Sequence, residues 1–209
     1  MTATISRAPH TGPVRAVVLD WAGTAVDYGC MGPADVFVKV FEIFGIAATV
    51  AEARQFMGLE KKEHIRRMCR LPRIAEQWAQ KHGQRPDETD VAKLYGQTEP
   101  MMVAAIGDHA APIQGLLPFV DAMRSRNIKI GSCTGYTAPM MAVLVPEAAR
   151  RGYAPDGAVC SSDVPAGRPF PWMCYQNAIL LQVYPFASMI KIGDTVSDIE
   201  EGRNAGMWT

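Results

Sequence analysis

The chain has 209 residues, of which 48% are hydrophobic and 20% are charged, the proportions of an ordinary soluble globular protein. Its 21 basic and 21 acidic residues cancel, so neither a nucleic-acid partner nor a polyanion is expected. The N-terminus lacks the apolar core of a signal peptide, and no apolar run is long enough to cross a membrane. Five scattered cysteines without a CxxC pair argue against a zinc site and a disulfide framework, and they favour a cytoplasmic location.

The first predicted element is a strand that ends in an acidic residue. Residues 1–13 precede it and are expected to be disordered. The run from Ala16 to Leu19 is apolar, which is typical of a strand buried on both faces, and Asp20 follows it. Ligands bind at that end of the strands in open α/β sheets, so Asp20 is a candidate catalyst. Aspartate is also a common turn residue, and this stretch alone leaves both interpretations open.

From residue 30 to residue 107 the pattern has helical periodicity. After Pro33, one helix face carries Val36, Phe37, Val40, Phe41 and Phe44. Gly45 suits the end of this helix, and Thr49 with Glu52 has capping-box spacing for a short second helix. Further helices are expected over 60–70, 73–82 and 88–105. No strand is predicted in this block.

After residue 112 strands and helices alternate. We expect strands over 128–132, 157–160 and 189–192, and helices over 116–126, 139–151, 171–181 and 197–205. Pro146 interrupts the pattern of the second of these helices. Such alternation predicts right-handed crossovers and a parallel sheet. The predicted fold class is therefore α/β: a doubly wound parallel core from residues 14–29 and 108–209, with an all-helical cap from residues 30–107 inserted into it.

Residues with useful chemistry follow the predicted strands. Thr134 comes after the second strand, and Asp194 and Asp198 come after the fourth, at the same sheet edge as Asp20. Such an oxygen-rich cluster suits Mg²⁺. Arg168, in the loop after the third strand, is a candidate to hold a phosphoryl oxygen. Singly, such residues are often helix caps or solvated side chains. Together they predict a phosphoryl-transfer site with a carboxylate nucleophile.

The order of these motifs resembles the haloacid dehalogenase superfamily. Most phosphatases of that superfamily carry a second aspartate two residues after the nucleophile, where this chain has Ala22. The chain resembles more closely the phosphonoacetaldehyde hydrolases (phosphonatases), over nearly all residues after 13. The runs that carry this resemblance are Asp20–Thr24, Val26–Cys30, Met57–Lys61, Thr134–Thr137, Asp163–Pro169, Pro171–Tyr175, Gly193–Asp198 and Gly202–Trp208. Glu60 and Cys133 depart from otherwise family-like runs.

The resemblance implies Mg²⁺-dependent hydrolysis of the P–C bond of phosphonoacetaldehyde. A carbanion leaving group needs an electron sink rather than an acid, and an imine on Lys61 would supply one. To attack, Lys61 must be neutral, so its pKa, normally about 10.4, must be lowered by burial or by nearby cations such as Lys62, Arg66 and Arg67. Without the resemblance, Lys61 would be interpreted as a solvated helix lysine.

The resemblance also implies the remaining site residues. His64 would shuttle protons in imine formation, Met57 would lie against Lys61 on the same helix face, and Cys30 and Tyr136 would lie at the site. The alternatives are a surface histidine for His64, a core methionine for Met57 and a buried thiol for Cys30. Mg²⁺ would be bound by Asp20, the backbone carbonyl of Ala22 and Asp194, with Asp198 in support.

Other functions stay open at this point. They are a phosphate-ester phosphatase or phosphomutase of the same superfamily, and a non-catalytic remnant. The chain stops before the family's usual end, so we expect a parallel strand beyond Gly206 to be missing and the sheet edge beside it to be bare. The resemblance further implies a homodimer through the cap. The apolar face that begins at Val36 fits either a dimer interface or the core of the cap.

Overall fold

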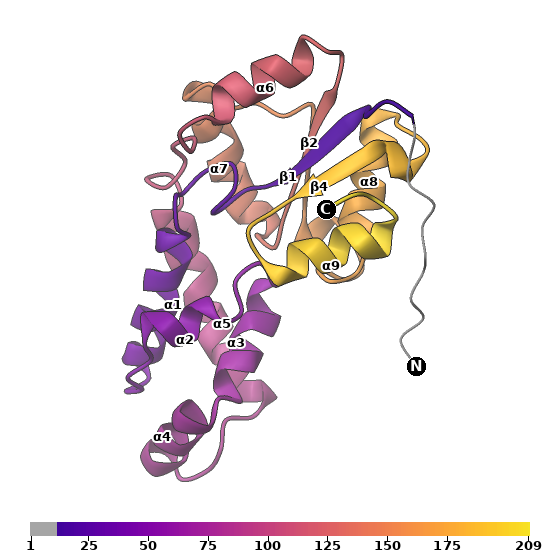
Figure 1. Ribbon diagram of the computed structural model, residues 1–209. Helices are drawn as coiled ribbons and strands as arrows, with labels where there is room; N and C mark the ends of the chain where they lie inside the picture. Colours follow the sequence, from indigo (N-terminus) through magenta and orange to yellow (C-terminus); the bar gives the residue numbers. More distant parts are fainter. Residues whose placement is uncertain (1–11) are drawn as a thin grey trace, which may run out of the picture.

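The computed structural model describes residues 12–209; residues 1–11 of the predicted disordered segment lie outside this range. Its four strands are β1 (Ala16–Asp20), β2 (Lys129–Thr134), β3 (Gly157–Cys160) and β4 (Met189–Ile192). They form one parallel sheet in the order β3-β2-β1-β4. This is the predicted doubly wound core, with β1 as an inner strand (Figure 1).

Helices cover both faces of the sheet, which explains why β1 is apolar throughout. Val17 and Leu19 pack in one cluster with α6 (Leu116–Arg124) and α7 (Ala138–Arg150). Ala16 and Val18 pack in a second cluster with α8 (Trp172–Leu181) and α9 (Val196–Ala205). Successive side chains of a strand point to opposite faces, so each face of β1 needs its own apolar residues. Two short 3₁₀ turns, η1 (Ser161–Asp163) and η2 (Phe186–Ser188), complete the core.

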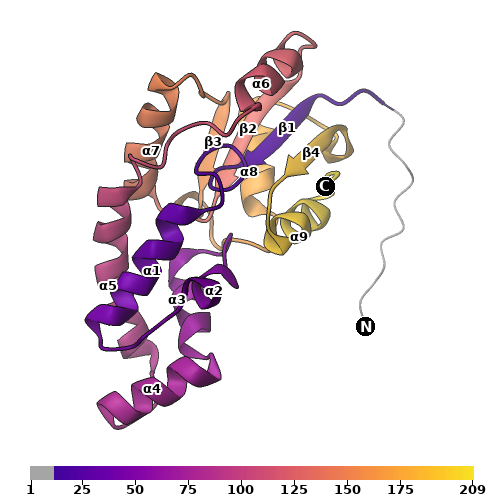
Figure 2. The same cartoon turned by 60° about the vertical axis from the view of Figure 1, so that its left-hand side comes forward.

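The helical block contains α1 (Met31–Ile43), α2 (Val50–Arg54), α3 (Lys61–Cys69), α4 (Pro72–His82) and α5 (Glu88–Ala105). It holds no strand, as predicted, and extends away from one end of the sheet (Figure 2). The apolar face from Val36 to Phe41 is buried inside this block, where α1 packs against α2 and α5. That face therefore belongs to the core of the helical block, and it is not free to form a dimer interface.

The first helix begins earlier than the sequence pattern predicts. Helix α1 starts at Met31 rather than at Pro33. The carboxylate of Asp27 accepts hydrogen bonds from the backbone N–H groups of Met31 and Gly32, both at 3.2 Å. These are two of the N–H groups that a helix leaves without internal partners. Asp27 thus stabilises the first turn from outside the helix.

Three other element boundaries differ slightly from expectation. Strand β2 begins at Lys129 and continues to Thr134, because its pairing with β3 extends to Cys160. Helix α6 ends at Arg124, two residues early. Helix α7 continues through Pro146 without interruption. The predicted capping box at Thr49 is present.

Strand β4 lies at the edge of the sheet, as expected, but over the described length this edge is not wholly bare. Trp208 donates its backbone N–H to the carbonyl of Met189 at 3.0 Å, and Lys191 donates to the carbonyl of Trp208 at 2.7 Å. This pairing is a parallel bridge that continues the sheet beyond β4.

None of the helices within residues 12–209 combines the length and the apolar character needed to cross a membrane.

Candidate active site

Asp20 lies at the carboxyl end of β1, directly beside Cys133 of β2. Its side chain is buried and pairs with Arg168, whose Nη2 lies 2.7 Å from Asp20 Oδ1. Burial raises the pKa of Asp20 to about 6, with the charge of Asp198 acting in the same direction and Arg168 opposing both. The carboxylate is thus ionised at neutral pH and oriented by a cation, which suits a nucleophile.

Arg168 lies in the loop between β3 and α8 and is 5% exposed. Its guanidinium contacts two further carboxylates, Asp198 at 3.0 Å and Glu201 at 2.9 Å. It also donates to the backbone carbonyl of Gly58 in the helical block at 3.1 Å. Burial alone would lower the pKa of Arg168, but these carboxylates raise it well above its ordinary value. Its observed contacts hold the acidic cluster together; contact with a phosphoryl oxygen stays a prediction.

Carboxylate oxygens from Asp20, Asp194 and Asp198 lie within 4.8 Å of one another. Asp194 is exposed, whereas Asp198 is fully buried and its Oδ1 lies 2.5 Å from Lys191 Nζ. Burial opposes ionisation of Asp198, but Arg168 and Lys191 outweigh it and lower the pKa. The donors are all hard oxygens, so they fit a hard divalent cation. Asp198 already has two cationic partners, which leaves Asp20 and Asp194 as the more available ligands.

The turn after Asp20 brings the backbone close to this cluster. Gly23 has a φ of +89°, and a Cβ atom there would lie 2.3 Å from Asp194 Oδ2, so only glycine fits this approach. Cys30 donates its thiol to the carbonyl of Ala22 at 3.0 Å and lies 3.7 Å from Asp194 Oδ2. Burial, followed by the charges of Asp194 and Asp20, raises the pKa of the Cys30 thiol, which is therefore neutral.

Lys61 is the first residue of α3 and is 3% exposed. Its Nζ lies 4.6 Å from the ring centre of Tyr136 and 5.9 Å from that of Phe37. Within residues 12–209 the Nζ atom of Lys61 has neither an ion pair nor a hydrogen bond. Burial lowers the pKa of Lys61 to about 8, and Arg168 acts in the same direction while Cys30 and Asp20 oppose it.

Of the two expected causes of this lower pKa, burial is confirmed as the larger, and the cation that contributes is Arg168 rather than Lys62, Arg66 or Arg67. Arg66 pairs with Glu63 and with Glu88, and Arg67 also pairs with Glu63. Their charges are largely neutralised by these partners, and burial, not a neighbouring helix cation, is the main cause of the shift at Lys61.

His64 lies one turn after Lys61, but it is fully buried rather than at the surface. Its ring stacks on Phe37 with ring centres 3.9 Å apart. Neither ring nitrogen makes a well-formed hydrogen bond among the described residues, and the backbone of Ala53 exerts a polar influence on the ring. Burial, reinforced by the charge of Lys61, lowers the pKa of His64 well below its ordinary value. The ring is therefore neutral, and its part in proton transfer stays a prediction.

The remaining predicted site residues lie where the helical block meets the core. Met57 precedes α3 in a turn and is half-buried, so the prediction that it shares a helix face with Lys61 is wrong: α3 begins at Lys61 and is capped by Glu60. Thr134 ends β2 and its hydroxyl accepts from the N–H of Tyr136 at 3.2 Å. A pocket of about 430 Å³ between the block and the core has Met57 and Asp194 in its lining.

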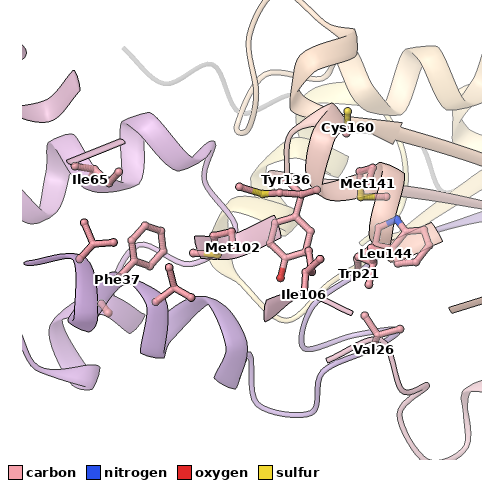
Figure 3. Packing of buried hydrophobic residues seen from close by; sticks show 14 of the residues in the cluster. Trp21, Val26, Phe37, Ile65, Met102, Ile106, Tyr136, Met141, Leu144 and Cys160 are labelled. Carbon is pink, nitrogen blue, oxygen red and sulfur yellow. The ribbon is translucent and has the colours of Figure 1, made fainter. Parts of the chain in front are cut away.

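One hydrophobic cluster runs through both parts of the molecule. Figure 3 shows Tyr136 in its middle, with Phe37 and Ile65 on the side of the helical block and Trp21 and Leu144 on the side of the core. Burying Tyr136 here raises the pKa of its hydroxyl well above the usual value. The packing therefore places an uncharged aromatic ring directly under the amine of Lys61.

Sequence reasoning missed Lys191 and Glu201, which are both fully buried. Lys191 pairs with Asp198, and Glu201 pairs with Arg168. Lys191 could have been found from the sequence, because a lysine inside a short apolar strand is unusual. Glu201 lies three residues after Asp198 in α9, hence on the same helix face. His109, which had no predicted role, lies 3.1 Å from Asp27.

Comparison with known proteins agrees with this geometry. The family model for haloacid dehalogenase-like hydrolases matches residues 14–206. The phosphonoacetaldehyde hydrolase of Nitratidesulfovibrio vulgaris is 60% identical over 96% of this chain and 71% of its own. That of Bacillus cereus (strain G9842) is 52% identical over 94% of this chain and 74% of its own.

Solved structures show the same fold. A phosphonoacetaldehyde hydrolase-like protein from Oleispira antarctica superposes with a TM-score of 0.93 at 41% identity, covering 97% of this chain and 74% of that one. A hydrolase from Pseudomonas syringae, 13% identical, shares the fold with a TM-score of 0.73 over 92% of this chain and 82% of its own. Haloacid dehalogenase-like hydrolases are generally metal-dependent, which agrees with the carboxylate cluster. The chain belongs to the haloacid dehalogenase-like hydrolases and, within them, to the phosphonoacetaldehyde hydrolase family.

Proposed function

We propose that this chain hydrolyses the P–C bond of phosphonoacetaldehyde to acetaldehyde and phosphate. The observation that carries the proposal is that one site holds both a buried amine, Lys61, and a buried carboxylate, Asp20. Lys61 has a pKa lowered to about 8, and it is close enough to Asp20 for the two charges to interact. Ala22 stands where a phosphatase would place its general acid. A site with an amine, and without a second carboxylate two residues after Asp20, suits a carbon leaving group better than an oxygen leaving group.

The first half of the reaction needs the neutral form of Lys61. Its amine attacks the aldehyde carbon, and loss of water with uptake of one proton gives a protonated imine. The carboxylate of Asp20 then attacks phosphorus and forms an aspartyl phosphate. The electron pair of the breaking P–C bond moves into the imine, which becomes an enamine. Arg168 orients Asp20 for this attack, and Thr134 stands at the neighbouring strand end.

The second half restores the enzyme. Water hydrolyses the phosphate from Asp20, and the enamine takes up a proton at carbon. A second water then hydrolyses the imine and releases acetaldehyde from Lys61. His64, Cys30 and Tyr136 are the candidates to move protons. Burial keeps the site dry, so the charges interact more strongly there than they would in water.

We propose Mg²⁺ as the metal. Asp20, Asp194 and the backbone carbonyl of Ala22 would hold it, with Asp198 in support. When bound, it would neutralise charge on the phosphoryl oxygens. The residues fit such an ion, because the donors are oxygens and the exposed Asp194 has no cationic partner among the described residues, its hydrogen bonds coming from Thr24 and Cys30.

The remaining parts of the proposal concern organisation. We propose that residues 30–107 act as a cap over the core site, which the burial of Lys61 supports. A homodimer stays a prediction of the family resemblance, and it would need a surface other than the buried face at Val36. A cytoplasmic location is favoured by the five cysteines, all of which are free thiols.

The test is release of acetaldehyde from phosphonoacetaldehyde in the presence of Mg²⁺, with Lys61→Arg as the inactive control. Borohydride reduction with substrate, followed by peptide mass mapping, should place the adduct on Lys61. An active enzyme without an adduct at Lys61 would contradict the imine. Comparable turnover of a generic phosphate ester would favour a phosphatase, and binding of Mg²⁺ without turnover would favour a non-catalytic remnant.

A further inference from the structure

A second cluster of metal-binding side chains lies behind Arg168, on the side of the sheet covered by α8 and α9. Cys133 of β2, Cys174 of α8 and Glu201 of α9 place their sulfur and oxygen atoms within 4.8 Å of one another. All three residues are completely buried. Their separation in the sequence gives no metal-binding spacing, so only the packing of α8 and α9 against the sheet brings them together.

One atom in this cluster has no partner. The Oε2 atom of Glu201 accepts from Arg168 at 2.9 Å and from the Cys133 thiol at 3.4 Å. Its Oε1 atom is buried without a hydrogen-bond partner among the described residues. Leaving a buried carboxylate oxygen unpaired is costly, and such atoms call for an explanation such as a bound ion.

We propose that Cys133, Cys174 and Glu201 form a binding site for a thiophilic divalent metal ion, and that its occupation weakens the ion pair between Glu201 and Arg168. Two sulfur ligands select Zn²⁺ or Cd²⁺ rather than Mg²⁺. The site is therefore chemically distinct from the oxygen cluster at Asp20 and Asp194.

Charge balance permits such an ion despite the neighbouring cations. Binding releases one proton from each thiol, so the divalent ion and two thiolates add no net charge to the buried cluster. Arg168 Nη2 lies 3.4 Å from Cys133 Sγ, so a positive charge faces this sulfur ligand. Three protein donors are fewer than the four of a closed structural zinc site, so the ion should exchange with solvent.

The consequence for activity follows from the contacts of Arg168. The same guanidinium binds both Glu201 and Asp20. An ion bound at the free Oε1 atom neutralises the charge of the Glu201 carboxylate. Its ion pair with Arg168 is then weaker, and the orientation of Asp20 changes with it. Occupation should therefore inhibit the enzyme by disturbing the position of its nucleophile.

The experiment titrates Cd²⁺ into the whole chain with excess Mg²⁺ present. We expect one Cd²⁺ per chain, an ultraviolet cadmium–thiolate absorption band, and a fall in activity of roughly 10- to 100-fold, the usual effect of losing an outer positioning contact. The cadmium NMR shift of the unsubstituted protein should report two sulfur ligands. The fall in activity rests on the proposed function, whereas the band and the NMR shift do not, so the two ideas can fail separately.

Variants locate the ion. Cys174→Ser should abolish both the band and the inhibition, and Cys133→Ser should do the same. Cys160→Ser is the matched control, because this buried thiol on β3 lies outside the cluster, and it should retain both effects. A band that survives in Cys174→Ser but vanishes in Cys30→Ser would overturn the proposal, since the ion would then lie at the catalytic cluster. Absence of any band, or oxidation of the two thiols to a disulfide in place of binding, would also overturn it.

Discussion

The amine of Lys61 lies 4.6 Å above the ring centre of Tyr136, across the boundary between the helical block and the sheet. No carboxylate pairs with this amine in residues 12–209. A carboxylate partner would favour the charged form, whereas an aromatic surface excludes water without adding a full negative charge. The arrangement explains how a lysine reaches a pKa of about 8.

The ring of Tyr136, rather than its hydroxyl, should matter for Lys61. Tyr136→Ala admits water, so the pKa of Lys61 should rise toward its ordinary value and the neutral amine at pH 7 should fall ten- to a hundredfold, each pKa unit being tenfold. Activity should fall by about the same factor. Tyr136→Phe keeps the ring and should stay within a few-fold of the unsubstituted enzyme. The pH dependence of borohydride trapping measures both; equal losses in the two variants would assign the effect to the hydroxyl.

Burying Lys61 should reduce stability. The folded chain releases this proton near pH 8, and the unfolded chain near 10.5, so unfolding takes up a proton between these values and stability rises with pH across that window. Lys61→Met should therefore stabilise the protein at pH 7, by on the order of 2–3 kcal/mol, and the gain should vanish toward pH 10.5. Lys62→Met is the neighbouring control and should change little. Urea unfolding at several pH values tests this; a gain that does not vary with pH would point to packing.

Substitution of Asp194 should weaken metal binding without weakening the fold. Asp194 is exposed and Asp198 is buried between two cations. Asp194→Asn should raise the Mg²⁺ concentration needed for activity roughly 10- to 100-fold, as loss of a group at a metal site does. Its free energy of unfolding should change by less than about 0.5 kcal/mol. The Mg²⁺ dependence of acetaldehyde release checks the first value, and thermal unfolding checks the second.

Lys191 should be required for folding rather than for substrate binding. Lys191→Met leaves Asp198 and Glu201 with one cation fewer in a fully buried cluster, and breaking a buried ion pair costs about 3–5 kcal/mol. Adding Asp198→Asn should recover part of this loss, because the unpaired charge is then removed. Denaturant unfolding of the two single variants and the double variant gives the coupling energy. Strictly additive effects would show that the two side chains do not interact.

Asp27 should stabilise the start of α1 through its acceptor oxygens and not through its charge. Asp27→Ala removes acceptors for Met31 and Gly32 and should cost about 1–2 kcal/mol. Asp27→Asn keeps one oxygen, and asparagine tolerates the positive φ of 54° at this position, so it should cost only a few tenths of a kcal/mol. A large loss in Asp27→Asn, measured by thermal unfolding, would instead implicate the pairing with His109.

The sequence pattern was sufficient to predict the strands and helices and the edge of the sheet where the candidate catalytic residues lie. The alternation of strands and helices after residue 112 predicts the parallel sheet, and the apolar run before Asp20 predicts an inner strand, because burial on both faces requires it. Errors at the ends of elements came from contacts that periodicity does not encode, one of them local and one distant in sequence. Asp27 extends α1, and pairing with Cys160 extends β2.

By itself, the amino-acid sequence determined the fold class, the family and the line of polar residues at the strand ends, because local periodicity and short motifs encode these features. Tertiary structure alone decided the environment of each side chain. It buried His64, paired Arg66 and Arg67 with glutamates, and placed Cys133 next to Cys174. Burial and long-range pairing set a pKa or create a metal-binding cluster, and neither can be seen in the spacing of residues along the chain.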